Sequence, residues 1–493
     1  MIRQVDWSCR KRAAVHIGLL AAMAAAMGLY HLRTTVVISP DGVLYVEMAR
    51  DLLQGQAPRG PRVPPGYPAM VAAAGALVGL DGQDARRDWA LTAQSVTLLC
   101  RVLSIVPLYL LYRRFIGGRG ALAAMAIMLA LPRFARYGAD ALRDWPFVLL
   151  FVSALAALSC AVRRGSLRWM LLAGLLAAGA SLVRAEGVLL AALGLAWIAR
   201  EGLARGGAWS GRRSAIAAGV LVGVFAAVAA AWLASTGYVP RNAGIVAEVL
   251  ANRPADAAAP LTGLAGVADF FVRVVHKSLS GMMYIPLALL LAGWAHRFRQ
   301  NADRHERFLM TALPVGWLAI LAVRYACVGP EISTRYIMAP AMAMGFYVWA
   351  GVRLVTVTLD RALRKRLRLA RWPGRLGLRG SAIATAALLI AAVPTLLLPV
   401  GHGKEVYRQA ASYLRRHSPP DAMVASFDSR VWFYSERTMG DSRVGFDYSV
   451  RQFSGEDPHF VAANWKKVFD EPVYKSRDRL VIYQCPNSRP PQP

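Results

Sequence analysis

Long runs of apolar residues alternate with short polar segments along the first 400 residues of the chain. A transmembrane helix needs about 20 apolar residues, with ~17 as the usual lower end, and soluble domains do not repeat stretches of that length. The pattern therefore predicts a polytopic membrane protein. The candidate runs are 13–32, 66–80, 89–111, 120–132, 145–162, 167–183, 187–199, 214–235, 279–296, 308–326, 337–358 and 381–400.

The short connections between these runs are strongly basic. Lys and Arg concentrate in cytoplasmic loops, so basic connections indicate which ends of the helices face the cytoplasm. The N-terminus is basic as well, and we expect all six segments on the cytoplasmic side. The five connections are 112–119, 163–168, 200–213, 297–307 and 360–380.

The chain must cross the membrane an even number of times between a cytoplasmic N-terminus and a cytoplasmic connection at 112–119. Three apolar runs, 13–32, 66–80 and 89–111, precede 112–119, so one of them does not span. The weakest is 66–80, which contains Gly and Pro and follows Pro64-Pro65. We predict that 66–80 is a juxtamembrane or re-entrant element on the outer side, and that eleven runs span. The outer segments are then 33–88, 133–144, 184–186, 236–278, 327–336 and the tail.

The last part of the chain, 401–493, has a different composition from everything before it. Residues 404–417 have the periodicity of an amphipathic helix, whereas 422–427 and 479–485 are typical of short strands. We expect a small soluble α/β domain on the periplasmic side. The predicted fold is thus an all-α transmembrane domain over 1–400, with about 11 transmembrane helices and outer juxtamembrane helices, followed by a periplasmic domain over 401–493.

Charge and composition sharpen this picture. Lys and Arg number 58 against 29 for Asp and Glu, giving a formal net charge of +29, while 56% of the residues are hydrophobic. A nucleic-acid-binding protein could carry that charge, but not together with this hydrophobicity, so we expect no nucleic-acid partner. The positive charge instead indicates which loops are cytoplasmic, where basic residues are also attracted to anionic membrane lipids. The preference for Arg over Lys and the abundance of Ala suggest a GC-rich bacterial genome, and hence a bacterial inner membrane.

The outer segments contain the chemically varied residues. The first holds Asp41 and Tyr45, spaced so that both can face one way along a helix. Asp41 and Asp144 could each be helix N-caps, Arg184 and Glu186 a structural pair, and Arg335 with Tyr336 an interfacial anchor. The candidates from the residues alone are Asp41, Tyr45, Asp140, Arg143, Asp144, Arg184, Glu186, Glu331, Arg335 and Tyr336.

Together these residues place carboxylates, arginines and tyrosines at the outer rim of four separate hairpins. Ionisable groups at membrane depth are functional more often than not. Arg and Tyr can hold a phosphate while apolar helix faces hold a lipid tail, and a carboxylate pair can act as base and positioner. The rim therefore suits a substrate with an anionic head and an apolar tail.

The order of these features resembles the GT-C glycosyltransferases that use polyprenyl-phosphate sugars, such as the protein O-mannosyltransferases and the aminoarabinose transferase acting on lipid A. The resemblance covers most of 13–400 and rests on order and topology. Its elements are Asp41 in PDGVLY, Pro64-Pro65-Gly66-Tyr67, the RRFIGG segment at 113–118, Asp144, the Arg184-x-Glu186-Gly187 turn, and Arg335-Tyr336 before Pro340.

The resemblance implies an inverting sugar transfer from a polyprenyl-phosphate donor to a lipid, glycan or protein acceptor. Asp41 would deprotonate the acceptor hydroxyl, and the charge of the leaving phosphate would be met by Arg184, Arg335 or Lys277. Asp144 would orient the acceptor or the sugar, with Asp140 competing for that assignment. Tyr67 and Arg62 complete the expected substrate-binding set, although Arg62 is displaced by one residue from Pro-Pro.

No DxD motif occurs in the outer loops, so a divalent metal is possible but not indicated, and no cofactor is expected. The main alternative function is a transporter or flippase of a lipid-linked sugar. Transporters carry charged residues at the bilayer midplane and repeated halves. Here the charged residues lie at the outer ends, with Arg101 as the clearest exception, and we favour the transferase.

Overall fold

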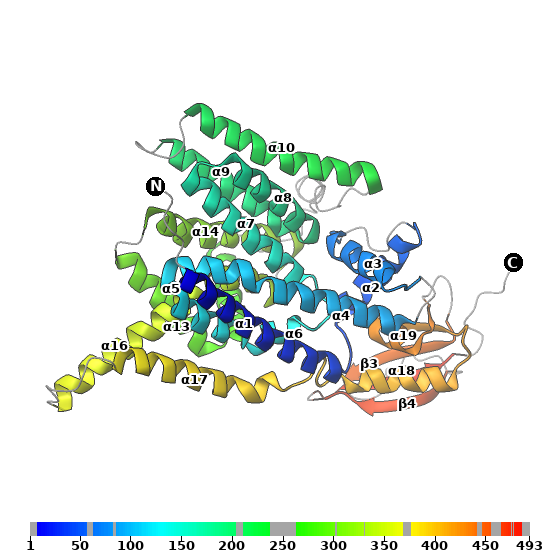
Figure 1. Cartoon of the computed structure of the whole chain (residues 1–493). Coiled ribbons are helices and arrows are strands. Elements are labelled where there is room, and N and C mark those ends of the chain that lie inside the picture. Colours follow the sequence, from blue (N-terminus) through cyan, green and yellow to red (C-terminus); the bar gives the residue numbers. More distant parts are fainter. Residues whose placement is uncertain are drawn as a thin grey trace.

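The computed structural model describes residues 7–56, 63–81, 85–203, 211–236, 263–300, 303–329, 331–367, 376–440, 446–454, 465–474, 476 and 478–485. Most of these residues are helical. Long helices pack side by side into a bundle, and a small sheet lies at one end of it (Figure 1). The start of α1 and the C-terminal end of α16 lie at the opposite end.

The helices of the bundle follow the apolar runs of the sequence. They are α1 (Trp7–Thr34), α2 (Pro40–Leu53), α3 (Gly66–Leu77), α4 (Arg86–Leu103), α5 (Ile105–Leu129), α6 (Pro132–Tyr137), α7 (Asp144–Arg164), α8 (Leu167–Val183), α9 (Val188–Leu203), α10 (Gly211–Thr236), α12 (Gly263–Met282), α13 (Tyr284–Arg299), α14 (Arg304–Val328), α15 (Arg335–Met344), α16 (Phe346–Leu367) and α17 (Leu376–Leu396). A short 3-10 turn, η1 (Ala185–Gly187), joins α8 to α9.

The prediction of a multi-pass helical protein is confirmed, but the count of eleven spans is supported only in part. Within the described residues, five helical stretches are long and apolar enough to cross a membrane, or seven if each bent helix pair is one span. Helices α8 and α9 have only 17 and 16 residues. At 1.5 Å per residue the shorter of them reaches about 24 Å, less than the ~30 Å hydrocarbon core.

The first predicted basic connection, 112–119, coincides with a break inside α5. Gly117 has φ 73° and ψ 172°, which is outside the helical region. A Cβ on Gly118 would lie 3.3 Å from the Tyr109 hydroxyl, so the chain folds back at this point. The two apolar runs on either side of Gly117 are therefore separate helical segments, as the sequence predicted.

The apolar run 66–80 forms α3, a helix of 12 residues. Its length of about 18 Å is too short to cross a bilayer. It packs against α2, α4 and α8, and Figure 1 shows α2 and α3 at the same end of the bundle as the sheet. The prediction that this run does not span agrees with its length.

Helix α12 was not predicted. The sequence places 236–278 in an outer connection, but α12 occupies Gly263–Met282. It meets α13 at an angle of 110° through Met283, whose φ is 63°. The predicted run 279–296 is therefore wrong at its start, because it joins the end of α12 to α13 across this bend. The remainder of the connection lies outside the described residues.

The C-terminal part contains α18 (Glu405–His417), β1 (Met423–Ser426), α19 (Ser429–Ser435), β2 (Thr438–Met439), β3 (Tyr448–Ser454), β4 (Lys466–Pro472) and β5 (Asp478–Gln484). The strands form one mixed sheet in the order β2-β1-β3-β5-β4. Strand β1 pairs in parallel with β2 and β3, while β5 pairs antiparallel with β3 and β4. The predicted helix at 404–417 and strands at 422–427 and 479–485 are found as α18, β1 and β5.

The sheet region is docked on the segment between α1 and α2 and on the start of α4. The Ile38 amide donates to the Tyr434 hydroxyl at 2.9 Å, and the Val36 amide donates to the Val400 carbonyl at 2.9 Å. The Arg86 guanidinium lies over the Trp432 ring, 5.1 Å from its centroid. The buried core runs on from the helices into this region. We retain the division into 1–400 and 401–493 as a proposal.

The topology can be tested with reporters fused after residue 84 and after residue 116. The first position follows α3 and the second precedes Gly117, so one crossing lies between them. Alkaline phosphatase should be active at residue 84 and inactive at residue 116, and a cytoplasmic fluorescent reporter should show the reverse. If both positions report the same side, 66–80 crosses the membrane after all.

Candidate active site

The start of α2 and the start of α15 meet through an ion pair. Arg335 Nη2 donates to Asp41 Oδ2 at 2.5 Å, although 294 residues separate the two in sequence. The Asp41 side chain is 46% exposed and that of Arg335 25% exposed. Two predicted site residues from distant parts of the chain are therefore in contact.

The expectation that Asp41 might cap its helix is wrong. Helix α2 begins at Pro40, and its N-cap is Ser39, whose hydroxyl accepts the Gly42 amide at 3.1 Å. Proline suits the first helical position because it has no amide hydrogen to leave unbonded. Asp41 is consequently the second helical residue, and its carboxylate is available to Arg335.

A second charge cluster lies where α7 begins and where α8 ends and α9 begins. Arg184 donates to Glu186 through Nη2 at 3.0 Å and through Nε at 3.3 Å, and its Nη1 donates to Asp144 Oδ1. The three side chains are nearly inaccessible, with 4%, 10% and 2% exposure for Arg184, Glu186 and Asp144. Asp144 is the first residue of α7, and the residue at the N-cap is Arg143. The expected capping role of Asp144 is therefore not observed.

The pKa of Glu186 shows how tightly this cluster is coupled. Burial acts to raise the pKa, but the charge of Arg184 and its hydrogen bonds outweigh burial and lower the pKa to about 2. Glu186 is consequently ionised at all physiological pH values. The structural pair that we considered for Arg184 and Glu186 exists, and Asp144 joins it as a third member.

Aromatic rings enclose the two clusters. The Arg184 guanidinium lies 4.9 Å from the centroid of Tyr336 and 5.6 Å from that of Phe147. Tyr336 is fixed in turn, because the Trp317 indole donates to its carbonyl at 2.8 Å and Arg324 lies 4.4 Å from its ring centroid. Tyr336 thus connects the Arg184 cluster with the start of α15, where Arg335 lies.

Asp140 has a different position from Asp144. Its Oδ1 accepts the Ser39 amide at 3.0 Å and the Ala141 amide at 2.8 Å, and the residue is only 8% exposed. Burial raises the pKa of Asp140 to about 6, against the opposing effect of the two amide donors. Asp140 holds the residue that caps α2, so it positions Asp41 from two residues away.

Some polar atoms near the ion pairs have no hydrogen-bond partner in the described part of the chain. They are Nη1 of Arg143 and Oδ2 of Asp144, both buried. Arg143 lies over the Tyr45 ring at 5.6 Å, and Tyr45 makes an edge contact with Tyr67 at 5.4 Å. This region therefore has both a donor and an acceptor that a bound polar ligand could use.

The remaining predicted residues are less closely connected. The Tyr67 hydroxyl is buried and bonded to the Ala93 carbonyl and the Thr97 hydroxyl, each at 2.8 Å. Glu331 is exposed, and Lys277 is partly buried on α12, which packs beside α15. Arg62 lies outside the described residues. Substrate contacts for Arg62, Tyr67, Lys277 and Glu331 stay predictions.

The sequence reasoning missed a polar stripe on α4 that supports the site. Gln94 Nε2 donates to the Ala139 carbonyl at 2.6 Å, Thr97 Oγ1 donates to the Leu142 carbonyl at 3.0 Å, and Arg101 donates to the carbonyls that end α5 and α6. These three residues recur at one helical face within an apolar run, which is the signal that could have identified them. They hold the loop that carries Asp140 and Asp144.

The donor set of the site is unlike a metal centre. Within the ranges described above, no group of three or more His, Cys, Asp or Glu side chains is placed to hold a metal ion. The carboxylates of Asp41, Asp144 and Glu186 are instead neutralised by guanidinium groups. Independence from metal stays a prediction of the sequence.

The raised pKa of Asp140 gives a testable pH dependence. A carboxyl whose pKa is about 6 in the folded state and lower in the unfolded chain binds its proton more tightly when folded, so stability falls as pH rises from about 4 to about 6. Asp140→Asn keeps the acceptor oxygen but cannot titrate. The Tm difference between wild type and Asp140→Asn should therefore change across this interval and level off above it. A difference that stays constant from pH 4.5 to 7.5 would contradict the placement, and exposed Asp88→Asn is the matched control.

Comparison with known proteins places this geometry in context. Residues 63–233 match the family of dolichyl-phosphate-mannose-protein mannosyltransferases. The structure is similar to ArnT from Cupriavidus metallidurans bound to undecaprenyl phosphate, with a TM-score of 0.60, 15% identity, and coverage of 97% of this chain and 99% of that one. It is also similar to the oligosaccharyltransferase of Archaeoglobus fulgidus in the apo form, with a TM-score of 0.53, 12% identity, and coverage of 88% and 69%. No curated protein matches by sequence. The chain thus has a fold similar to those of ArnT and of the oligosaccharyltransferase over 97% and 88% of its length, and this is the kind of fold that the sequence resemblance implied.

Proposed function

We propose that this protein is an inverting glycosyltransferase that moves a sugar from a polyprenyl-phosphate donor to an acceptor hydroxyl on the outer face of the membrane. Asp41 is the base. The observation that carries the proposal is the contrast among the carboxylates: Asp41 is 46% exposed, whereas Asp140 and Asp144 are buried. A general base must reach the proton that it removes, so only Asp41 of these three can meet an acceptor from solution.

The reaction is a single displacement. The acceptor oxygen attacks the anomeric carbon while its proton passes to a carboxylate oxygen of Asp41. The bond between that carbon and the phosphate oxygen breaks, and the polyprenyl phosphate leaves with the electron pair. Attack opposite the leaving group inverts the anomeric configuration.

Charge at the site supports this assignment. Three carboxylates and three guanidinium groups lie together at the site: Asp41, Asp144 and Glu186 with Arg143, Arg184 and Arg335. Arg184 is committed to two carboxylates. Arg335 is partly exposed and has only Asp41 as its ion-pair partner in the described chain. As Asp41 gains a proton and the leaving phosphate gains charge, Arg335 and Arg143 are the cations placed to stabilise it.

An apolar pocket near the site could hold the start of the lipid tail. It has a volume of about 250 Å³ and lies between α5, α13 and α17, with Leu131, Tyr284 and Leu388 among its walls. Leu131 immediately precedes α6, and the Tyr137 hydroxyl at the end of α6 bonds to Thr334, which adjoins Arg335, at 2.6 Å. The short helix α6 thus connects the apolar pocket at its start with the segment that carries Arg335 at its end.

The comparisons support the donor class. The matching family is named for dolichyl-phosphate mannose, and ArnT is seen with undecaprenyl phosphate. We extend to this chain only the shared feature, a polyprenyl phosphate. We propose a lipid, glycan or protein acceptor, and a bacterial inner-membrane location with a cytoplasmic N-terminus and a periplasmic tail.

The alternative of a transporter or flippase gains no support from the charged residues. Arg101 was the clearest candidate for a charged group along a transport path. It is fully buried and donates to the carbonyls of Leu129 and Ala135, with its guanidinium 5.6 Å from the Trp145 ring centroid. Arg101 therefore has a structural role, because it binds carbonyl groups at the C-terminal ends of α5 and α6.

The proposal predicts the effect of Asp41→Asn. Loss of a general base typically lowers the rate by roughly 10²- to 10⁴-fold. Asparagine keeps an oxygen for Arg335, so the variant should insert and fold normally. Cell-envelope glycans and glycolipids, compared by mass spectrometry with and without the protein, identify the product, and its formation should be lost with Asp41→Asn.

The matched control is Asp88→Asn, which removes an exposed carboxylate from the first turn of α4. It should retain full product formation. Wild-type levels of product from Asp41→Asn, at equal protein abundance, would contradict the assignment of the base.

A further inference from the structure

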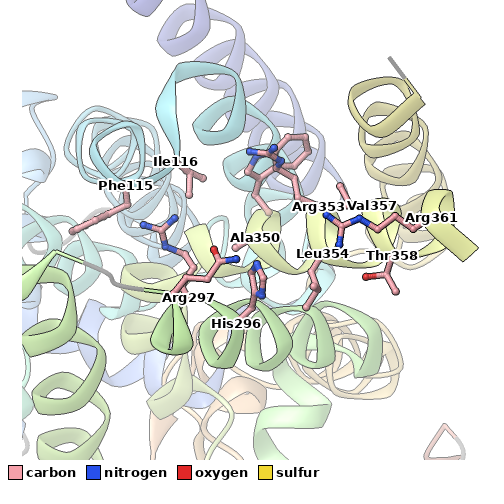
Figure 2. A pocket seen from close by; sticks show the side chains of 12 residues that line it. Phe115, Ile116, His296, Arg297, Ala350, Arg353, Leu354, Val357, Thr358 and Arg361 are labelled. Carbon is pink, nitrogen blue, oxygen red and sulfur yellow. The ribbon is translucent and has the colours of Figure 1, made fainter. Parts of the chain in front are cut away.

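A second polar pocket lies between α5, α13 and α16, and its volume is about 450 Å³. Its walls are Phe115 and Ile116 of α5, then His296, Arg297 and Gln300 at the end of α13, and one face of α16 from Trp349 to Arg361. Figure 2 shows His296 and Arg297 on one side of this hollow and Arg353 and Arg361 on the other. It lies at the end of the bundle where the basic connections occur, away from Asp41.

The pocket is cationic. Arg297, Arg353, Arg361 and His296 line it, and the lining contains no carboxylate. Arg297 is held by Glu306 through two bonds of 2.6 Å. Arg353 and Arg361 are exposed, and neither makes an ion pair or side-chain hydrogen bond with any residue that the structure describes. Two arginines thus have all of their donors available for a ligand.

The arginines share one helical face. Arg353, Val357 and Arg361 follow one another at intervals of four residues, so their side chains project in a common direction from α16. The opposite wall is rigid, because Phe115 stacks on Phe346 with 4.7 Å between ring centroids. The cations therefore face a preformed space.

The surroundings of the pocket are apolar. Ile116, Leu354 and Val357 line it, and Phe298, Val355 and Leu359 beside it are 47%, 50% and 56% exposed. Large apolar side chains exposed on a spanning helix face lipid tails. An occupant of this pocket therefore meets guanidinium groups at one end and a hydrocarbon environment at the other.

We propose that this pocket binds the phosphate of an anionic phospholipid from the leaflet on the side of the basic connections. A guanidinium group can donate two parallel hydrogen bonds to phosphate oxygens, and basic pockets between transmembrane helices bind anionic head groups. Phe115, Ile116 and Val357 contact the first part of the acyl chains. The site is separate from the transfer reaction and does not depend on the proposed function.

The experiment uses the full-length protein in detergent micelles. Phosphatidylglycerol or phosphatidylcholine is added, and bound lipid is counted by native mass spectrometry. Wild type should retain phosphatidylglycerol in preference to phosphatidylcholine. The double variant Arg353→Gln with Arg361→Gln should bind phosphatidylglycerol ~30-fold more weakly, since each basic residue near an anionic lipid contributes about a factor of 5.

A double variant of two exposed arginines at the same end, Arg299→Gln with Arg307→Gln, is the matched control because it removes equal charge outside the pocket. It should keep wild-type binding. Equal weakening in both double variants would show only general attraction to the basic end and would overturn the proposal. Displacement of the lipid by millimolar inorganic phosphate would identify a soluble anion as the occupant and would overturn the lipid assignment.

Discussion

The guanidinium group of Arg184 is withdrawn from water, and because arginine does not lose its proton in proteins, its charge must be neutralised where it lies. The two carboxylates that do so come from different elements, Asp144 at the start of α7 and Glu186 in the turn between α8 and α9. Loss of one partner would leave an uncompensated buried charge, at a cost of about 3–5 kcal/mol. The outer ends of these helices are therefore fixed relative to one another.

The cluster around Arg184 explains how the partly exposed pair of Asp41 and Arg335 can be held in a defined position. The loop before α7 carries Asp140, which bonds to the cap of α2, and the backbone of α2 comes so close that a Cβ on Gly42 would lie 2.8 Å from the Ala141 carbonyl. A Cβ on Gly66 would lie 2.7 Å from the Leu182 carbonyl, at the end of α8. Only glycine permits such approaches, and they bring α2 and α3 against the buried cluster. Asp41 is thereby accessible without being mobile.

The apolar runs predicted most of the bundle because hydrophobic length is a local property of the chain. The same local reasoning failed where two nearby residues could both cap a helix, and where a strand mixes polar and apolar residues without a regular pattern. Ser39 took the cap that we considered for Asp41, because Pro40 begins the helix. Strand β4, with the sequence KKVFDEP, has no clear alternation of apolar residues, so it was not recognised.

The candidate site was predicted as a set of residues but not as an arrangement. The sequence predicted that Asp41, Asp144, Arg184 and Arg335 lie on outer segments, and a family resemblance suggested roles for them. It could not show that Arg335 pairs with Asp41 while Arg184 pairs with Asp144, since those contacts depend on how distant helices pack. The polar face of α4 could be read from the sequence, but the partners of Gln94 and Thr97 could not, because they are backbone carbonyls of a distant loop.

The most direct test of the catalytic account is an experimental structure of the full chain with a bound, non-transferable polyprenyl-phosphate sugar. The account predicts that the phosphate contacts Arg335 or Arg143, and that the anomeric carbon faces the Asp41 carboxylate across a space wide enough for an acceptor hydroxyl. A donor bound with its anomeric carbon out of reach of Asp41 would contradict the account.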